Sequence, residues 1–210
     1  YGVINMPGYI GGINWGGDAS GDAPRHAPSF FSDHAANRFP YRNRILTWFS
    51  LFGHPLQTVA GREGGFERSI VQTNWLDTQS PNMQGKALHH EFVGNWENMA
   101  HHLDALRPRL ILFLSATLLD ALNSPGIFPE AQHILGCADR PLFLQKEVTS
   151  HGRRLKRFRV GMQDFEHTSV IALPHPTGSK GLSNEYISAF APEISAHIAN
   201  YKESRNFVTR

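Results

Sequence analysis

Short apolar runs recur along the chain, and each is bounded by polar or helix-breaking residues. Four of these runs have the length and composition of strands that are buried on both faces. They are Tyr9–Ile13, Ser69–Asn74, Leu110–Ser115 and Ser169–Leu173. Two shorter candidates, Pro141–Glu147 and Arg154–Val160, predict a hairpin or an extension of the sheet, with the sequence TSHG as the turn.

Helical patterns fill the intervals between the apolar runs. They cover Asn43–Phe52, Glu91–Leu106, Ala116–Leu122 and Asn184–Tyr201. Gly53 and Pro108 are natural stops for the first two helices. The alternation of strands and helices predicts an α/β fold, a three-layer α/β/α sandwich with a central, mainly parallel four-stranded sheet. Because no repeat or linker interrupts the pattern, a single domain over residues 1–210 is expected.

The composition is that of an ordinary globular protein, with 40% hydrophobic and 18% charged residues among 210. No apolar run approaches the roughly 18 residues that span a bilayer, so no membrane partner is expected. A single cysteine, Cys137, excludes an internal disulfide and a cysteine-ligated iron–sulfur cluster, which needs about four thiolates. This cysteine usage predicts a reducing, cytoplasmic location.

Positive charge is concentrated locally although the net charge is only +2. The stretch SHGRRLKRFR, residues 150–159, holds five Lys and Arg residues, and Arg38, Arg42 and Arg44 form a second group. Such patches can lie along a phosphate backbone. They are equally typical of solvated surface strands and helices, so both interpretations stay open.

Polar residues follow three of the predicted strands at the point where each strand ends. Asn14 follows the first strand, Asn74 ends the second, and His175 follows the fourth. Ligands of open α/β sheets bind at the carboxyl ends of the strands. We therefore expect the two amides and the imidazole to converge on one edge of the sheet.

Several common types of site are absent from the sequence. The pairs His89-His90 and His101-His102 are about 18 Å apart along a shared helix, too far to bind one ion. A G-x-S-x-G elbow is lacking, and neither a phosphate loop nor the Rossmann glycine pattern has the required spacing. No metal or cofactor is expected.

The three convergent residues suit cleavage of an N-glycosidic bond. Asn14 is no strong base, but its amide can hold a water molecule and fix its direction of attack. Asn74 can donate to and accept from the edge of a nucleobase. His175 can donate to an oxygen of the departing base and stabilise the anion that forms there.

Four segments carry a resemblance to a known family. They are Gly12-Ile13-Asn14 followed by Gly16, HAANRF at His34–Phe39, VQTNWLDTQSP at Val71–Pro81, and LPHPTGSKGLS at Leu173–Ser183. In that order they resemble the motifs of the uracil-DNA glycosylase superfamily, nearest to its mismatch-specific uracil/thymine and single-strand-selective branches. In the mismatch-specific branch the first two motifs have the sequences GINPG and HPANRF. The last motif is HPS or NPSGLS in different branches.

The resemblance implies a monofunctional DNA glycosylase that acts as a monomer in base excision repair. Asn14 would orient the attacking water, His175 would donate to the pyrimidine O2, and Asn74 would read the base. The pocket for the flipped base would contain Gly12, Ile13, Trp15, Gly16, Phe30 and Phe31, of which Phe31 or Phe30 stacks on the base. Leu182 would be the wedge that fills the duplex, and the phosphate contacts would come from Ser80, Thr177, Ser179 and Lys180.

Two departures from the family pattern affect the expected pocket. Trp15 replaces the usual proline, so its ring would either line the pocket or pack below it. Gly16 stands where the strict uracil branch has a bulky tyrosine that clashes with the methyl group of thymine. A glycine there predicts tolerance of substituents at C5 of the pyrimidine.

Each of these residues also has a purely structural alternative. Asn14 and Asn74 could bond backbone at strand ends, and His175 could pack within a loop. Phe30 and Phe31 could be core residues, and Leu182 could anchor the last helix with Ser183 or Asn184 as its N-cap. Two other functions stay open: a non-catalytic lesion- or nucleic-acid-binding module on the same fold, and a hydrolase of free nucleosides or nucleotides.

Overall fold

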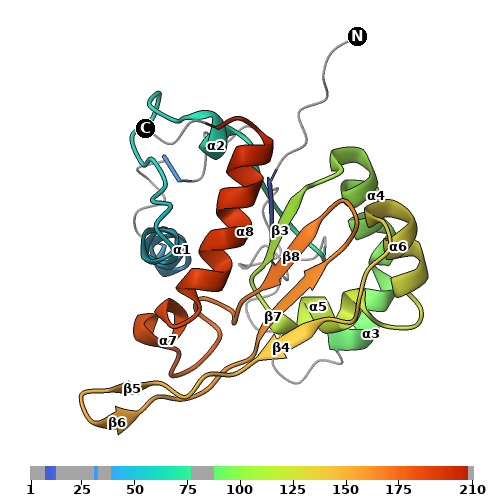
Figure 1. The fold of residues 1–210 in the computed structure, drawn as a ribbon. Helices are drawn as coiled ribbons and strands as arrows, with labels where there is room; N and C mark the ends of the chain where they lie inside the picture. The colour runs from blue at the N-terminus through green and yellow to red at the C-terminus, as the bar shows by residue number, and fades with distance from the viewer. Residues whose placement is uncertain (1–7, 13–30, 33–38, 77–87, 208–210) are drawn as a thin grey trace, which may run out of the picture. The chain divides into compact units, whose positions relative to one another are not determined.

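The computed structural model describes residues 8–12, 31–32, 39–76 and 88–207 (Figure 1). The chain divides into two compact units, each built from three stretches of sequence. Unit 1 contains Tyr1–Arg25, Ile70–Phe143 and Val160–Leu173, and unit 2 contains His26–Ser69, Leu144–Arg159 and Pro174–Arg210. The single domain over residues 1–210 stays a prediction, and each unit is described by itself.

Unit 1 is built on a mixed sheet with the strand order β2-β1-β3-β8-β7-β4. The strands are β1 (Gly8–Gly12), β2 (Ile70–Asn74), β3 (Leu110–Phe113), β4 (Leu142–Leu144), β7 (Val160–Asp164) and β8 (Ser169–Ala172). The neighbours β2-β1, β1-β3 and β3-β8 are parallel, whereas β7 runs antiparallel to β8.

The four strands expected from the apolar runs are β1, β2, β3 and β8, within two residues at each end. The expected number of four strands was wrong, because β7 and β4 extend the sheet beyond β8. The two weaker sequence candidates signalled this extension only in part: β4 lies within Pro141–Glu147, whereas β7 begins where Arg154–Val160 ends. The α/β class is confirmed, and the three-layer sandwich stays a prediction.

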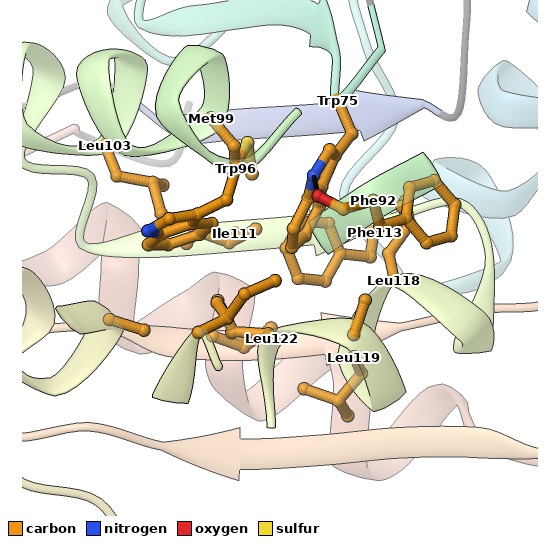
Figure 2. Packing of buried hydrophobic residues seen from close by; sticks show 14 of the residues in the cluster. Trp75, Phe92, Trp96, Met99, Leu103, Ile111, Phe113, Leu118, Leu119 and Leu122 are labelled. Atoms are coloured by element: carbon orange, nitrogen blue, oxygen red, sulfur yellow. Dashed lines mark hydrogen bonds between the residues drawn. The ribbon is translucent and has the colours of Figure 1, made fainter. Parts of the chain in front are cut away.

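One face of the sheet carries a hydrophobic core, which Figure 2 shows around Trp75, Trp96 and Phe113. Ile111 and Phe113 point to this face from β3, as alternate residues of a strand must. The neighbouring residues Leu110 and Leu112 are also buried. Continuous burial explains why the strand is apolar at every position rather than at alternate ones.

Four helices cover this face of the sheet: α3 (Leu88–Gly94), α4 (Trp96–Leu106), α5 (Ala116–Leu122) and α6 (Phe128–Leu135). The prediction of one long helix over Glu91–Leu106 was wrong, because the chain breaks between α3 and α4. Gly94 is a poor helix former, and the Asn95 side chain donates to the Glu91 carbonyl at 2.9 Å. The pattern also gave no signal for α6.

Unit 2 contains the helices α1 (Pro40–Leu51), α2 (Gly65–Arg68), α7 (Asn184–Ser188) and α8 (Ala191–Ser204). The single helix expected over Asn184–Tyr201 is in fact two. Pro192 stands in the first turn of α8, where it has no N–H to donate and would clash with a carbonyl of a continuing helix. The break at Ala189–Phe190 follows from that residue.

A two-residue hairpin in unit 2 joins β5 (Thr149–Ser150) to β6 (Arg153–Arg154). The turn residues His151 and Gly152 both have positive φ, 48° and 74°. Such a turn matches the right-handed twist of the flanking strands. The turn predicted from TSHG is confirmed for its last two residues, whereas Thr149–Ser150 form β5. None of the helices in the described part of the chain is long and apolar enough to cross a membrane.

Candidate functional site

The predicted site residues divide between described and undescribed parts of the chain. Outside the described residues lie Ile13, Asn14, Trp15, Gly16, Phe30 and Ser80. Gly12 and Asn74 belong to unit 1. Phe31, His175, Thr177, Ser179, Lys180 and Leu182 belong to unit 2. The convergence of Asn14, Asn74 and His175 around one base therefore stays a prediction.

Asn74 ends β2 and pairs in register with Gly12, the last residue of β1. The two strands thus finish level, as the site hypothesis requires of neighbouring parallel strands. Asn74 is 9% exposed, and its carboxamide forms no hydrogen bond with another described residue. A carboxamide whose donors and acceptor are not taken up by other described residues suits recognition of a polar ligand.

Gln72 is a polar neighbour that the sequence analysis missed. It precedes Asn74 by two positions in β2, and alternate residues of a strand share a face. The Gln72 Oε1 atom is buried and has no hydrogen-bond partner among the described residues. Counting back by two from Asn74 would have found it.

Trp75 fixes the backbone immediately after Asn74. Its indole lies 5.4 to 6.0 Å from three aromatic rings, those of Phe92, Trp96 and Phe113. The indole N–H donates to the Phe92 carbonyl at 3.0 Å, and the Trp75 carbonyl accepts from the Asn98 amide at 3.0 Å. The residue that follows Asn74 is therefore fixed in the core through its indole N–H and through its backbone carbonyl, and Figure 2 shows the ring among its aromatic neighbours.

His175 lies in the segment that links β8 to α7, which we call the His175 loop (residues 174–183). Its Nδ1 atom accepts hydrogen bonds from the backbone N–H of Gly178 at 2.7 Å and of Thr177 at 3.3 Å. An imidazole nitrogen that accepts carries no proton. The neutral ring must then carry its proton on Nε2, which becomes the only donor of the side chain.

The surroundings of His175 keep the imidazole neutral. Burial lowers the pKa of His175 from its ordinary value, because a charged ring loses hydration there. The Tyr41 ring of α1 lies 5.9 Å from the imidazole at a tilt of 47°. Burial also raises the pKa of Tyr41, so its phenol stays protonated. Tyr41 is a neighbour that no sequence signal indicated, because 134 positions separate the two residues.

Gly178 permits the close approach of the loop backbone to His175. A Cβ atom at this position would lie 2.9 Å from the histidine Nδ1, closer than real Cβ contacts. A side chain at residue 178 would therefore displace the amide that fixes the imidazole.

Arg44 of α1 holds the two ends of the His175 loop. Its guanidinium donates to the Pro176 carbonyl at 2.8 Å and also to the Leu182 carbonyl. It lies 5.9 Å from the centre of the Trp48 ring, whose indole N–H donates to Asn184 at the start of α7. The loop is thus fixed to two helices of unit 2.

Two members of the group Arg38, Arg42 and Arg44 donate to backbone carbonyls, and phosphate binding by the group stays a prediction. Arg38 lies outside the described residues. Arg42 is 3% exposed and donates to the Phe31 carbonyl, and Arg44 is engaged by the His175 loop. Both guanidinium groups serve as internal donors to backbone carbonyls.

The remaining predicted residues differ in exposure. Thr177 and Lys180 are exposed and Ser179 is half-buried, so all three can reach a solvent-side ligand. Phe31 and Leu182 are buried at 2% and 6% exposure. Ser183 accepts from the Tyr186 N–H at 3.2 Å as the N-cap of α7. The burial of Leu182 matches the structural alternative, an anchor for the following helix, and its role as a wedge stays a prediction.

No group of three His, Cys, Asp or Glu side chains within the described ranges is arranged to hold a metal ion.

The stability of the fold should decrease as the pH falls below about 6.5, the ordinary pKa of histidine. Burial lowers the pKa of three histidines: His54, His102 and His175. Protons then bind the unfolded chain more readily than the folded one, so stability present above the unfolded pKa is lost as the pH falls through the folded pKa. Urea unfolding at pH 7 and pH 5 measures the effect.

Two variants identify the share of His175 in that pH dependence. His175→Gln should show a smaller loss of stability between pH 7 and pH 5 than the wild type. His133→Gln, on the exposed face of α6, should match the wild type. An unchanged pH dependence in His175→Gln would contradict the assignment of a half-buried, neutral imidazole.

The sequence matches no model of a known protein family, and a search of curated proteins finds no similar sequence.

Proposed function

We propose that the protein is a monofunctional DNA glycosylase, which hydrolyses the N-glycosidic bond of a flipped-out uracil or C5-modified pyrimidine. The observation that carries the proposal is the state of His175. Two backbone N–H groups occupy Nδ1, and burial lowers the pKa of the ring. A neutral imidazole with its proton on Nε2 is suited to donate to the O2 atom of a departing pyrimidine.

The proposed reaction is a hydrolysis in which the base leaves as an anion. The bond between C1′ and N1 breaks, and its electron pair stays on the base. The Nε2–H of His175 donates a hydrogen bond to O2, where the negative charge develops. A water molecule oriented by Asn14 forms the new C1′–O bond and releases its proton to solvent, from which the base is finally protonated.

Asn74 supports recognition of the base. Its carboxamide is at the carboxyl end of a parallel strand, is nearly buried and is uncommitted among the described residues. One amide can donate to O4 and accept from N3–H of uracil together, whereas cytosine, with an amino group at C4 and an unprotonated N3, would require the reversed amide. The exposed Thr177 and Lys180 and the half-buried Ser179 are available for phosphates beside the base.

The wild-type protein should release free base from duplex DNA that contains uracil, and also from duplexes with 5-hydroxymethyluracil or thymine opposite guanine. The residue type at position 16 motivates the wider range, because a glycine has no side chain that could clash with a substituent at C5. Base release is measured by chromatography of the free base, with no chelatable metal added. Activity confined to uracil would overturn the assignment to Gly16, and no release from any duplex would overturn the proposed function.

The variant Asn14→Ala serves as the matched control of this experiment. It should lose base release while it still binds a duplex with an abasic site, because only the water is lost. Release of base from free deoxyuridine but not from DNA would instead support a nucleoside hydrolase. Binding to DNA without base release by the wild type would support a non-catalytic module.

A further inference from the structure

The hairpin of β5 and β6 begins a strongly cationic segment, which we call the basic arm (residues 149–159). It contains no Asp or Glu. Its five Lys and Arg side chains are all exposed: Arg153, Arg154, Lys156, Arg157 and Arg159. Figure 1 shows the arm as an extended hairpin with β5 and β6 at its tip.

Few acidic groups neutralise the basic arm among the described residues. Glu147 lies 3.9 Å from Arg154 and 3.5 Å from Arg157, and all three side chains are more than half exposed. Such exposed ion pairs stabilise a structure by about 0–1 kcal/mol, so a stronger anion can displace them. His151 at the turn interacts with the exposed Glu185 of α7. The four cationic residues Arg153, Arg154, Lys156 and Arg157 thus outnumber Glu147, the acidic side chain that forms ion pairs with two of them among the described residues.

The chemistry of the arm fits a polyanion better than a protein surface. The only large apolar side chains in residues 149–159 are Leu155 and Phe158, and both are half-buried. Protein interfaces need an apolar or aromatic centre that loses its water on binding. An extended chain rises about 3.3 Å per residue, close to the ~3.4 Å axial spacing of phosphates along one strand of B-DNA.

The part of the arm that follows β6, residues 155–159, contacts the His175 loop and α7. Lys156 Nζ donates to the Lys180 carbonyl at 3.0 Å, and its aliphatic chain approaches Gly181, whose φ is +87°. The Tyr186 hydroxyl of α7 donates to the Phe158 carbonyl at 2.5 Å, and the two rings meet edge to face at 5.9 Å. A ligand held by the arm would therefore be held beside the loop that carries His175.

We propose that the basic arm binds the phosphate backbone of duplex DNA that flanks the nucleotide held at the His175 loop. This inference rests on the proposed function for the identity of the polymer. The arm supplies affinity through charge and sets the position of the duplex without reading its sequence.

The test compares two double variants that remove equal charge. Arg153→Gln with Arg154→Gln changes the tip of the arm. Arg62→Gln with Arg140→Gln changes two exposed arginines elsewhere in the chain. Binding of each protein to a labelled, undamaged B-DNA duplex is measured by fluorescence anisotropy over a series of salt concentrations. Thermal unfolding of both variants checks that they are folded.

The arm variant should lower the slope of log K against log salt by about 1.8, since each phosphate contact contributes about 0.9. The control variant should keep the wild-type slope. Equal slopes in the two variants would overturn the proposal. Tighter binding of the wild type to an RNA duplex or to polyglutamate, lost in the arm variant, would also overturn it, because the partner is then not DNA.

The outcomes separate this inference from the proposed function. The undamaged duplex needs no catalysis, so arm-dependent binding by a protein that releases no base would support the arm and overturn the glycosylase. Base release by the wild type, together with identical salt slopes in the two variants, would support the glycosylase and overturn DNA binding by the arm.

Discussion

His175→Ala should slow base release by about 10²–10³-fold under single-turnover conditions, the usual consequence of removing one preorganised donor to a developing anion. The donor in question is Nε2–H, which the Gly178 and Thr177 amides select by occupying Nδ1. Because the charge on O2 appears only in the transition state, the loss should fall on kcat. Binding to a duplex with an abasic site should change little.

His175→Gln is the informative second variant for this prediction. Its side-chain amide can still donate, but it cannot accept from both loop amides with the same ring geometry. We expect a rate between those of the wild type and His175→Ala. His133→Ala on α6 should behave as the wild type. Full activity in His175→Ala would remove the imidazole from the mechanism, even if base release by the wild type were established.

The central strands β3 and β8 were predictable from local sequence because they are buried along most of their length. β3 and β8 are continuous apolar runs, and β1 and β2 are short runs bounded by polar or glycine residues. The edge strands β7 and β4 were harder to predict. β4 is only three residues long and partly exposed, and β7 contains Gly161 and the buried Gln163, which obscure an apolar pattern.

Two helices were predicted too long because the pattern of apolar residues does not show local breaks in the backbone. An apolar stripe continues through Gly94-Asn95 and through Ala191-Pro192, so the spacing alone predicts two long helices. Backbone chemistry decides otherwise, through a competing side-chain hydrogen bond in the first case and a missing N–H in the second. The residue types Gly94-Asn95 and Pro192 therefore predict the helix breaks better than the apolar spacing does.

The candidate site was predictable only where chemistry coincides with the end of a strand. Asn74 and His175 were selected in that way, and their roles stay predictions. The residues that shape the His175 loop, Arg44 and Tyr41, were not, because their contacts join positions more than 130 residues apart. The spacing of charges did not indicate the contacts of Arg42 and Arg44. A group of arginines in the sequence shows neither their burial nor the carbonyls to which they donate.

Trp75→Ala should lower the free energy of unfolding by about 3–5 kcal/mol, the range for truncating a large aromatic residue in a core. Trp75 is 1% exposed and is among the largest fully buried side chains. Its removal leaves a cavity between β2 and the helices α3 and α4, and it also leaves the Phe92 carbonyl without its indole donor. Urea unfolding followed by circular dichroism measures the loss.

Trp75→Phe separates the cost of the cavity from the cost of the lost indole hydrogen bond. It also tests whether packing of residue 75 affects Asn74. It keeps an aromatic ring but loses the N–H, so the loss should be near 1–3 kcal/mol, the penalty for an unpaired buried carbonyl. Because Trp75 directly follows Asn74, this variant should also weaken discrimination between uracil and cytosine in DNA while it stays folded. A loss below 1 kcal/mol in Trp75→Ala would contradict the packing around the indole. Unchanged discrimination in a folded Trp75→Phe would mean that Asn74 holds its position without the ring, through the sheet pairing with Gly12.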